Sequence, residues 1–203
     1  NSLVLMPDGK IVIGGTFSNV KGNTDTTLTV RRGLARFNND GTVDETGLTT
    51  TTTHDFGVAG TYTIRISGTF PRVDFNYGGD RLKLISVDQW GTGVWDSFDS
   101  AFFGCTNMHI TATDAPVLTN VTTFTYAFRE SGLTNEDLHA WNMSHVQYLL
   151  GIFQDTAYNG NVSTWDTSAV SDMSATFYND TAFNQDISAW NTSNVATFSG
   201  MFY

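Results

Sequence analysis

The sequence has few basic residues, one cysteine and no long apolar run, and each shortage excludes a class of protein. Lys and Arg together number 10 against 20 Asp and Glu, so the formal net charge at pH 7 is −10. A protein this acidic is unsuited to binding nucleic acid through phosphate neutralisation, and an anionic membrane repels it. No apolar stretch approaches the roughly 18 residues that a transmembrane helix needs. We therefore expect no nucleic-acid partner and no membrane insertion by this segment.

The single cysteine, Cys105, has no partner for an intrachain disulfide. We interpret it as a packed thiol; the alternative, a nucleophile, needs a base within reach, and the sequence names none. The sequence also has no CxxC pair, no glycine-rich phosphate loop and no Ser nucleophile elbow. Its histidines lack metal-ligand spacing; they are His54, His109, His139 and His145. These shortages predict no enzymatic activity, no cofactor and no metal site.

What the sequence does contain is an apolar signature that recurs five times at a spacing of 24 to 26 residues. In each copy the signature positions follow i, i+3, i+6, i+7, as in Trp95, Phe98, Ala101 and Phe102. The later copies begin at Val121, Val146, Val170 and Val195. This spacing places the signature positions on one face of a two-turn helix, so it predicts a short helical segment in each copy.

A second recurring piece lies between these segments. It is Asp137–Trp141, then Asn161–Trp165, then Asp186–Trp190. The alternation of polar, apolar and polar residues predicts a strand of three or four residues whose middle side chain points inward. A periodic strand-plus-helix unit of this length indicates a leucine-rich-repeat type solenoid, in which each unit becomes stable by stacking on its neighbour.

The run Phe183–Phe202, with Ile187 and Trp190 at the matching places, closely resembles the BspA-like bacterial surface repeat, also catalogued as DUF285. Val162–Met173 resembles it as well, and Ala101–Met108 resembles the treponemal variant of the same group. The resemblance implies an extracellular protein of a cell or virion surface that acts in adhesion and has no enzymatic activity. We expect the solenoid to span residues 91–203 and to continue beyond Tyr203, because the chain stops straight after a complete signature.

The residues before the solenoid are expected to be β-structure. Residues 1–47 form a hairpin module in which Pro7-Asp8-Gly9 is a turn, and they resemble the delta-60 repeat of β-propeller-like arrays. Residues 48–53 are a Thr-rich linker or an edge strand. In residues 54–90 the stretches Gly60–Gly68 and Arg81–Val87 alternate like strands, and the first resembles the last hairpin of a PKD-type, immunoglobulin-like sandwich. The predicted fold class is therefore mixed β and α/β.

The candidate binding residues are two outward polar columns beside the inward strand positions. The first column is Asp137, Asn161 and Asp186, and the second is His139, Ser163 and Ser188. Since neighbouring strands lie about 4.8 Å apart, the columns are expected to form a continuous polar ribbon. Tyr126, Tyr148 and Tyr178 fall outside the apolar positions and are further candidates for sugar or protein contacts.

The net charge favours neutral or basic partners, such as a glycan or protein of a host or neighbouring cell. The first hypothesis is therefore an adhesion or recognition module of a surface protein or phage fibre. The alternative is a structural subunit of a filament or virion decoration that self-assembles.

Overall fold

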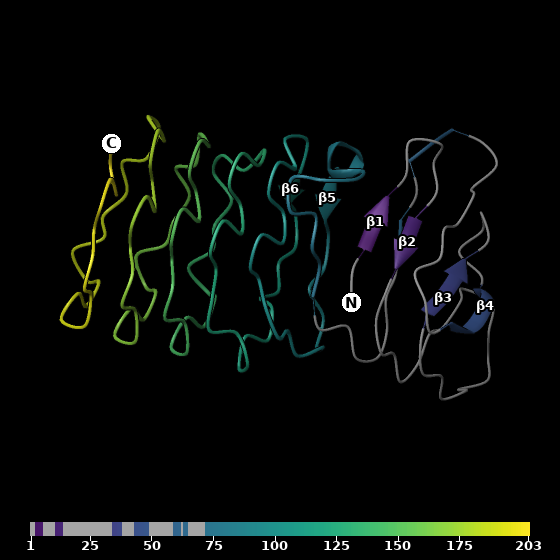
Figure 1. Ribbon diagram of the computed structural model, residues 1–203, viewed down its shortest axis with the longest axis horizontal. Helices are drawn as coiled ribbons and strands as arrows, with labels where there is room; N and C mark the ends of the chain where they lie inside the picture. The colour runs from purple at the N-terminus through teal and green to yellow at the C-terminus, as the bar shows by residue number, and fades with distance from the viewer. Residues whose placement is uncertain are drawn as a thin grey trace.

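The computed structural model describes residues 72–203 without a gap, residues 59–61 and 63–64, and four short strands nearer the N-terminus (Figure 1). These strands are β1 (Leu3–Leu5), β2 (Ile11–Ile13), β3 (Leu34–Phe37) and β4 (Val43–Leu48). A 3-10 helix, η1 (Arg81–Lys83), and two further strands follow, β5 (Ser86–Val87) and β6 (His109–Ile110). Within the described residues no helix is long and apolar enough to cross a membrane.

The four N-terminal strands make two antiparallel pairs. In the first pair Leu3 lies opposite Ile13 and Leu5 opposite Ile11, as predicted for strands that flank Pro7-Asp8-Gly9. In the second pair β3 and β4 run antiparallel with register shifts. Strand β4 ends at Leu48, one residue past the boundary predicted at residue 47. The rest of the predicted Thr-rich linker, residues 49–53, lies outside the described residues.

Residues 72–90 of the segment predicted to be PKD-like β-structure are part of the stack of repeats. The predicted strand Arg81–Val87 begins as η1 and becomes extended only at β5, which pairs in parallel with β6. The hydrophobic core also crosses the boundary predicted between residues 90 and 91, because Val73, Phe75 and Trp90 are buried in it. Most of the other predicted strand, Gly60–Gly68, lies outside the described residues.

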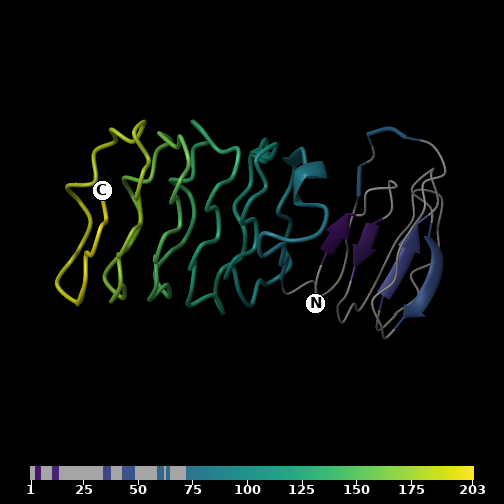
Figure 2. The same ribbon diagram turned by 45° about the horizontal axis from the view of Figure 1, so that its top comes forward.

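From residue 72 onward the chain is a stack of coils (Figures 1 and 2). We define the coils as residues 72–94, 95–120, 121–145, 146–169, 170–194 and 195–203, so that each coil after the first begins at a signature residue. Parallel bridges join neighbouring coils at matching positions; they pair Thr123 with Tyr148, Tyr148 with Asp172, and Asp172 with Thr197. The assignment of this stack to the leucine-rich-repeat class stays a prediction.

The signature segments are turns, so the prediction of a short helix in each copy is wrong. In the coil 121–145 the N–H groups of Tyr126, Phe128 and Glu130 donate to carbonyls of the next coil at 2.9 to 3.0 Å. The intervening N–H groups of Ala127 and Arg129 donate three residues back in their own coil. Tyr126 and Glu130 also have positive φ, 52° and 50°. A helix would send every N–H four residues back and would exclude positive φ.

The physical reason is that successive tight turns return side chains to the interior every three or four residues, as a helix does. The two arrangements therefore share one apolar spacing. The prediction of short strands around Leu138, Val162 and Ile187 is also wrong, because these segments form tight turns. In each turn the carbonyl of the central residue accepts the N–H of the Trp three residues further along the chain. The extended bridge positions lie two residues after each signature Val, inside the segments predicted to be helical.

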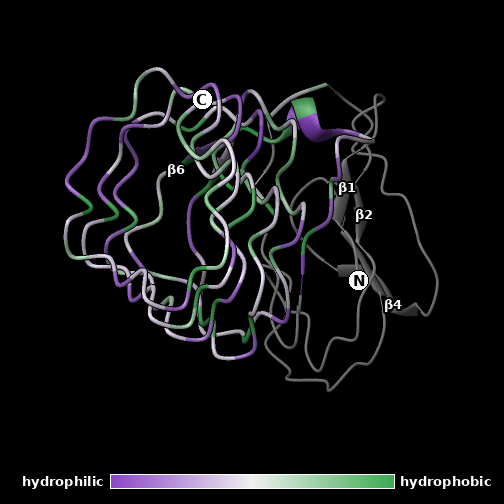
Figure 3. Cartoon of the chain, turned by 60° about the vertical axis from the view of Figure 1, so that its left-hand side comes forward, coloured by the Kyte–Doolittle hydropathy of each residue, from purple (hydrophilic) through white to green (hydrophobic). Residues whose placement is uncertain are grey.

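The interior of the stack is built from side chains that repeat from coil to coil. One ladder of rings consists of Phe102, Phe128, Phe153, Phe177 and Phe202, whose neighbouring centroids lie 5.5 to 6.0 Å apart. Trp165 and Trp190 stack at 6.0 Å, and their Nε1–H groups donate to the Leu138 and Val162 carbonyls of the preceding coil. Figure 3 shows hydrophobic and hydrophilic segments alternating around the coils. Ring stacking and cross-coil hydrogen bonds together hold the coils in register.

Candidate functional site

The first two predicted columns lie along one set of turns, which we call the Asx-turn edge. It consists of Asp137, His139, Asn161, Ser163, Asp186 and Ser188. The Oδ1 atoms of Asp137, Asn161 and Asp186 each accept the backbone N–H two residues on, at 3.1, 3.0 and 2.9 Å. The residues do align from coil to coil, but as turn-forming side chains and not as a strand ribbon. Their polar atoms are thus partly used by their own backbone.

The carboxylates of this edge are ionised at neutral pH. For Asp137, slight burial raises the pKa, but hydrogen bonds from the His139 N–H and imidazole outweigh it, so the pKa lies below its usual value. The His139 Nδ1 lies 2.7 Å from the Asp137 Oδ1. For Asp186 the backbone and side chain of Ser188 lower the pKa. Asn161 and Ser163 are half-buried, while the four other side chains are exposed.

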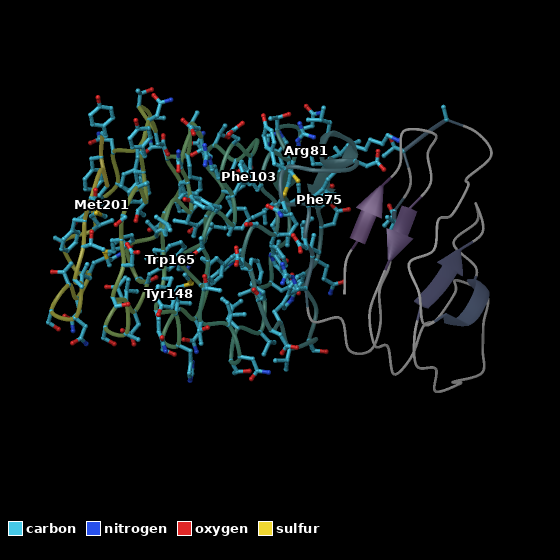
Figure 4. The ribbon with its side chains drawn as sticks, in the orientation of Figure 1. Phe75, Arg81, Phe103, Tyr148, Trp165 and Met201 are labelled. Carbon is cyan, nitrogen blue, oxygen red and sulfur yellow. The ribbon has the colours of Figure 1, made fainter. Side chains whose placement is uncertain are left out.

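The three candidate tyrosines do not form one site. Tyr148 is 43% exposed and stands in the column of parallel bridges between Thr123 and Asp172. Figure 4 shows it well separated from Arg81 and Phe103. Tyr126 and Tyr178 are half-buried, and Tyr178 stacks on Tyr203 at 5.0 Å with an angle of 12°.

Sequence reasoning missed a second surface, which we call the arginine–aromatic edge: Tyr77, Arg81, Phe103, Tyr126 and Arg129. The Arg81 guanidinium lies 4.4 Å over the Tyr77 ring, and Tyr77 contacts Phe103 with centroids 4.8 Å apart. The Arg129 guanidinium lies 5.0 Å over Phe103 and 5.4 Å over Tyr126. The Tyr77–Phe103 ring contact and the cation–π contact of Arg129 with Phe103 therefore link side chains of three successive coils.

Two glycines make room for this edge. A Cβ at Gly104 would lie 2.6 Å from Cδ2 of Tyr77 and 2.7 Å from Cδ of Arg81. A Cβ at Gly151 would lie 2.6 Å from Cε1 of Tyr126. Both glycines have positive φ, 77° and 58°. The rings of one coil thus rest on the bare backbone of the next.

The two arginines differ in their charge partners. Arg129 lies 3.5 Å from a Glu130 carboxylate oxygen and 3.4 Å from one of Asp155, so its charge is compensated. Arg81 forms no ion pair within the described residues, and its Nε is buried without a hydrogen-bond partner. The neighbouring Lys83 is paired with Asp80 at 3.3 Å. Arg81 is therefore the cation of this edge whose charge has no acidic partner among the described residues.

The sequence held a signal for this surface. Arg129 is the last basic residue of the chain, and no Lys or Arg follows it. Phe103 and Arg129 both come directly after a signature Phe, in a column that continues with Gln154, Tyr178 and Tyr203. Comparing the columns outside the apolar signature would have shown that basic and aromatic residues share this one.

Two side chains with potential nucleophiles, those of Cys105 and Tyr158, lie inside the stack. Cys105 is fully buried, and burial raises the pKa of its thiol far above its usual value, although the charge of Arg81 acts in the opposite direction. Burial likewise raises the pKa of Tyr158, whose hydroxyl donates to the Glu136 carbonyl. Among residues 72–203 no three His, Cys, Asp or Glu side chains are grouped so that they could hold a metal ion.

The sequence was compared with known families, curated proteins and solved structures. The family described as "Mycoplasma protein of unknown function, DUF285" matches residues 86–203. The chain belongs to this family. Residues 7–46 are similar to a second family, described as "Domain of unknown function (DUF5122) beta-propeller". No curated protein and no solved structure matches the chain. The DUF285 match begins at Ser86, within the first coil, so the family unit includes β5 and β6.

Proposed function

We propose that this DUF285 chain is a non-enzymatic recognition module of an extracellular surface, on a cell or a virion, that binds a glycan or protein of a host or neighbouring cell. The observation that carries the proposal is the contrast between inward and outward columns. The inward positions stay apolar from coil to coil, as in the Phe ladder. The outward positions change in size and charge, as in Thr123, Tyr148 and Asp172.

This contrast is what recognition requires. Stacked repeats obtain their stability from nearest-neighbour contacts, so an outward side chain can change without loss of the fold. A scaffold of this kind presents a long surface in which each coil contributes a different chemical group. The resemblance to bacterial surface repeats and the match to the DUF285 family support the surface assignment. The net charge of −10 favours neutral or basic partners, with binding to a basic partner weakened by salt.

The test is direct binding of the intact chain to immobilised glycans and to a panel of purified basic proteins, at low and at physiological salt. Saturable binding to a defined glycan or protein supports the proposal. The proposal would be overturned in favour of the structural-subunit alternative if no saturable binding is found and sedimentation velocity shows that copies of the chain associate into larger assemblies.

A further inference from the structure

The arginine–aromatic edge departs from the rest of the stack at Arg81. The other basic residues between 72 and 203 are Arg72, Lys83 and Arg129, and each is in an ion pair. The Arg81 guanidinium lies 4.4 Å over the Tyr77 ring and has no acidic partner among the described residues. Because its Nε is buried, the pair of Nη groups is the side of the guanidinium that can offer parallel N–H donors to a carboxylate.

Among the described residues, the neighbours of Arg81 are aromatic rings and a glycine. Tyr77 is 48% exposed, and Phe103 packs beside it. Gly104 has no side chain to separate the Tyr77 ring and the arginine from the backbone of the next coil. A pyranose ring has an apolar C–H face that can pack on an aromatic ring, and its hydroxyls can reach the rim of the site.

Backbone groups along this edge are already used. The N–H of Tyr77 donates to the Phe103 carbonyl, and those of Phe102 and Gly104 donate to carbonyls of the following coil, all at 2.8 to 3.2 Å. An extended peptide that adds as a strand needs a free backbone ladder, and this edge does not provide one. The arrangement therefore favours a sugar over a peptide.

The charge of the whole protein limits the ligand further. Because the net charge of the protein is −10, a ligand that carries many negative charges would be repelled by the protein as a whole, and not only at the site of contact. A ligand with an isolated carboxylate avoids this repulsion, because the remaining charges are screened beyond about 8 Å at physiological salt.

We infer that Arg81, Tyr77 and Phe103 form a binding site for an oligosaccharide that carries a single carboxylate, such as a terminal sialic or uronic acid. The carboxylate pairs with the Arg81 guanidinium, and a sugar ring packs on the part of the Tyr77 side chain that Arg81 and Phe103 leave exposed. Arg129 is a positioning residue here, since its charge is compensated and it holds Phe103 and Tyr126 together. This inference rests on the proposed recognition function and names the ligand class for it.

The experiment is calorimetric titration of the intact chain with sialyllactose and with a glucuronic-acid-terminated trisaccharide. Lactose and an acetylated peptide with one Glu serve as ligand controls. Three variants are compared: Arg81→Gln, Arg81→Lys and Asn142→Asp. Asn142→Asp lowers the net charge by the same amount as Arg81→Gln, and Asp166 already occupies the matching position of the next coil with the same turn hydrogen bond. Thermal unfolding of each variant establishes that it is folded.

The expected result is that an acidic sugar binds more tightly than lactose or the peptide. Arg81→Gln should weaken that binding about tenfold or more, the size of one charge-assisted hydrogen-bond contact. The affinity of Arg81→Lys should lie between those of the natural chain and Arg81→Gln, because lysine keeps the charge and loses the fork. Asn142→Asp should bind like the natural chain.

If neither acidic sugar binds, or if Arg81→Lys and Arg81→Gln bind unchanged, the inference is wrong. Binding of a neutral glycan or a basic protein in that case leaves the recognition function standing and removes only this site. Equal binding of the peptide would show that a carboxylate suffices and would overturn the sugar assignment.

Discussion

The Asx-turn edge and the arginine–aromatic edge both run along the stack, but they differ in what their polar groups already do. At the first edge, carboxylate and amide oxygens accept hydrogen bonds from their own turns, within two residues. At the second edge, rings and guanidinium groups contact one another across coils, and Arg81 has no acidic partner in the part of the chain that the structure describes. A polar, regularly spaced column can therefore be structural, and the proposed recognition surface is the less regular one.

The largest expected effect comes from removing the anchor beneath the Asx-turn edge. Trp165 is 3% exposed, and its Nε1–H donates to the Leu138 carbonyl at 2.8 Å. Trp165→Ala should cost about 3–5 kcal/mol of unfolding free energy, because a cavity remains and the Leu138 carbonyl keeps only one of its two hydrogen bonds, the one from the Trp141 N–H. Urea denaturation measures this loss. A cost below about 1 kcal/mol, within the range of a surface substitution, would show that the Trp does not anchor this edge.

The next effect concerns the arginine–aromatic edge. Gly151→Ala should destabilise the protein by about 1–3 kcal/mol, because a Cβ meets the Tyr126 ring at a residue of positive φ. Ala175, with a φ of 52°, shows that the conformation alone tolerates alanine in this column. Adding Tyr126→Ser to Gly151→Ala should recover part of the loss in a double-mutant cycle. Strictly additive effects would mean that the ring does not rest on Gly151.

A smaller effect tests whether the Asx-turn edge is structural. Asn161 Oδ1 accepts both the N–H and the hydroxyl of Ser163, at 3.0 and 2.8 Å. Asn161→Ala should cost about 0.5–2 kcal/mol, as for loss of a capping side chain. Asn161→Asp is the matched control, since Asp137 and Asp186 occupy the same column. The prediction fails if the Ala and Asp variants unfold at the same denaturant concentration.

The smallest effect is expected for Asp137→Ala combined with Asp186→Ala. Both side chains are exposed, but each carboxylate accepts a turn N–H, so a small loss of stability is expected. Because both folded-state pKa values lie below the ordinary value, this stabilisation is present above about pH 3.9 and disappears as pH falls through the folded-state pKa. Melting curves at pH 7 and pH 2.5 compare the two conditions. A difference between variant and natural chain that is larger at the lower pH would contradict this reading.

The inward residues were predictable from the sequence, and the path of the backbone was not. Phe128 and Phe153 occupy repeated apolar positions, and both are fully buried as expected. Their spacing could not distinguish a helix from successive tight turns, because both return a side chain to the interior every three or four residues. The decisive property is the positive φ of residues such as Tyr126 and Glu130, which no local propensity indicates for those residue types.

The candidate site was predictable only in part, for a related reason. Asp137, Asn161 and Asp186 were predicted to lie in one column, and each makes the same hydrogen bond to its own turn, which cannot be read from spacing. The arginine–aromatic edge depends on contacts between Tyr77, Phe103 and Arg129, which lie in three different coils. Predicting such contacts requires knowledge of the length and register of each coil, and these differ slightly from repeat to repeat.

The most direct test of which edge is the recognition surface is a titration of the intact chain with sialyllactose, followed by amide chemical shifts. The account predicts that the largest shifts fall on Tyr77, Phe103 and Gly104, and that Asp137, Asn161 and Asp186 stay unchanged. Shifts centred on those three Asx-turn residues, with none at Tyr77 or Gly104, would contradict it.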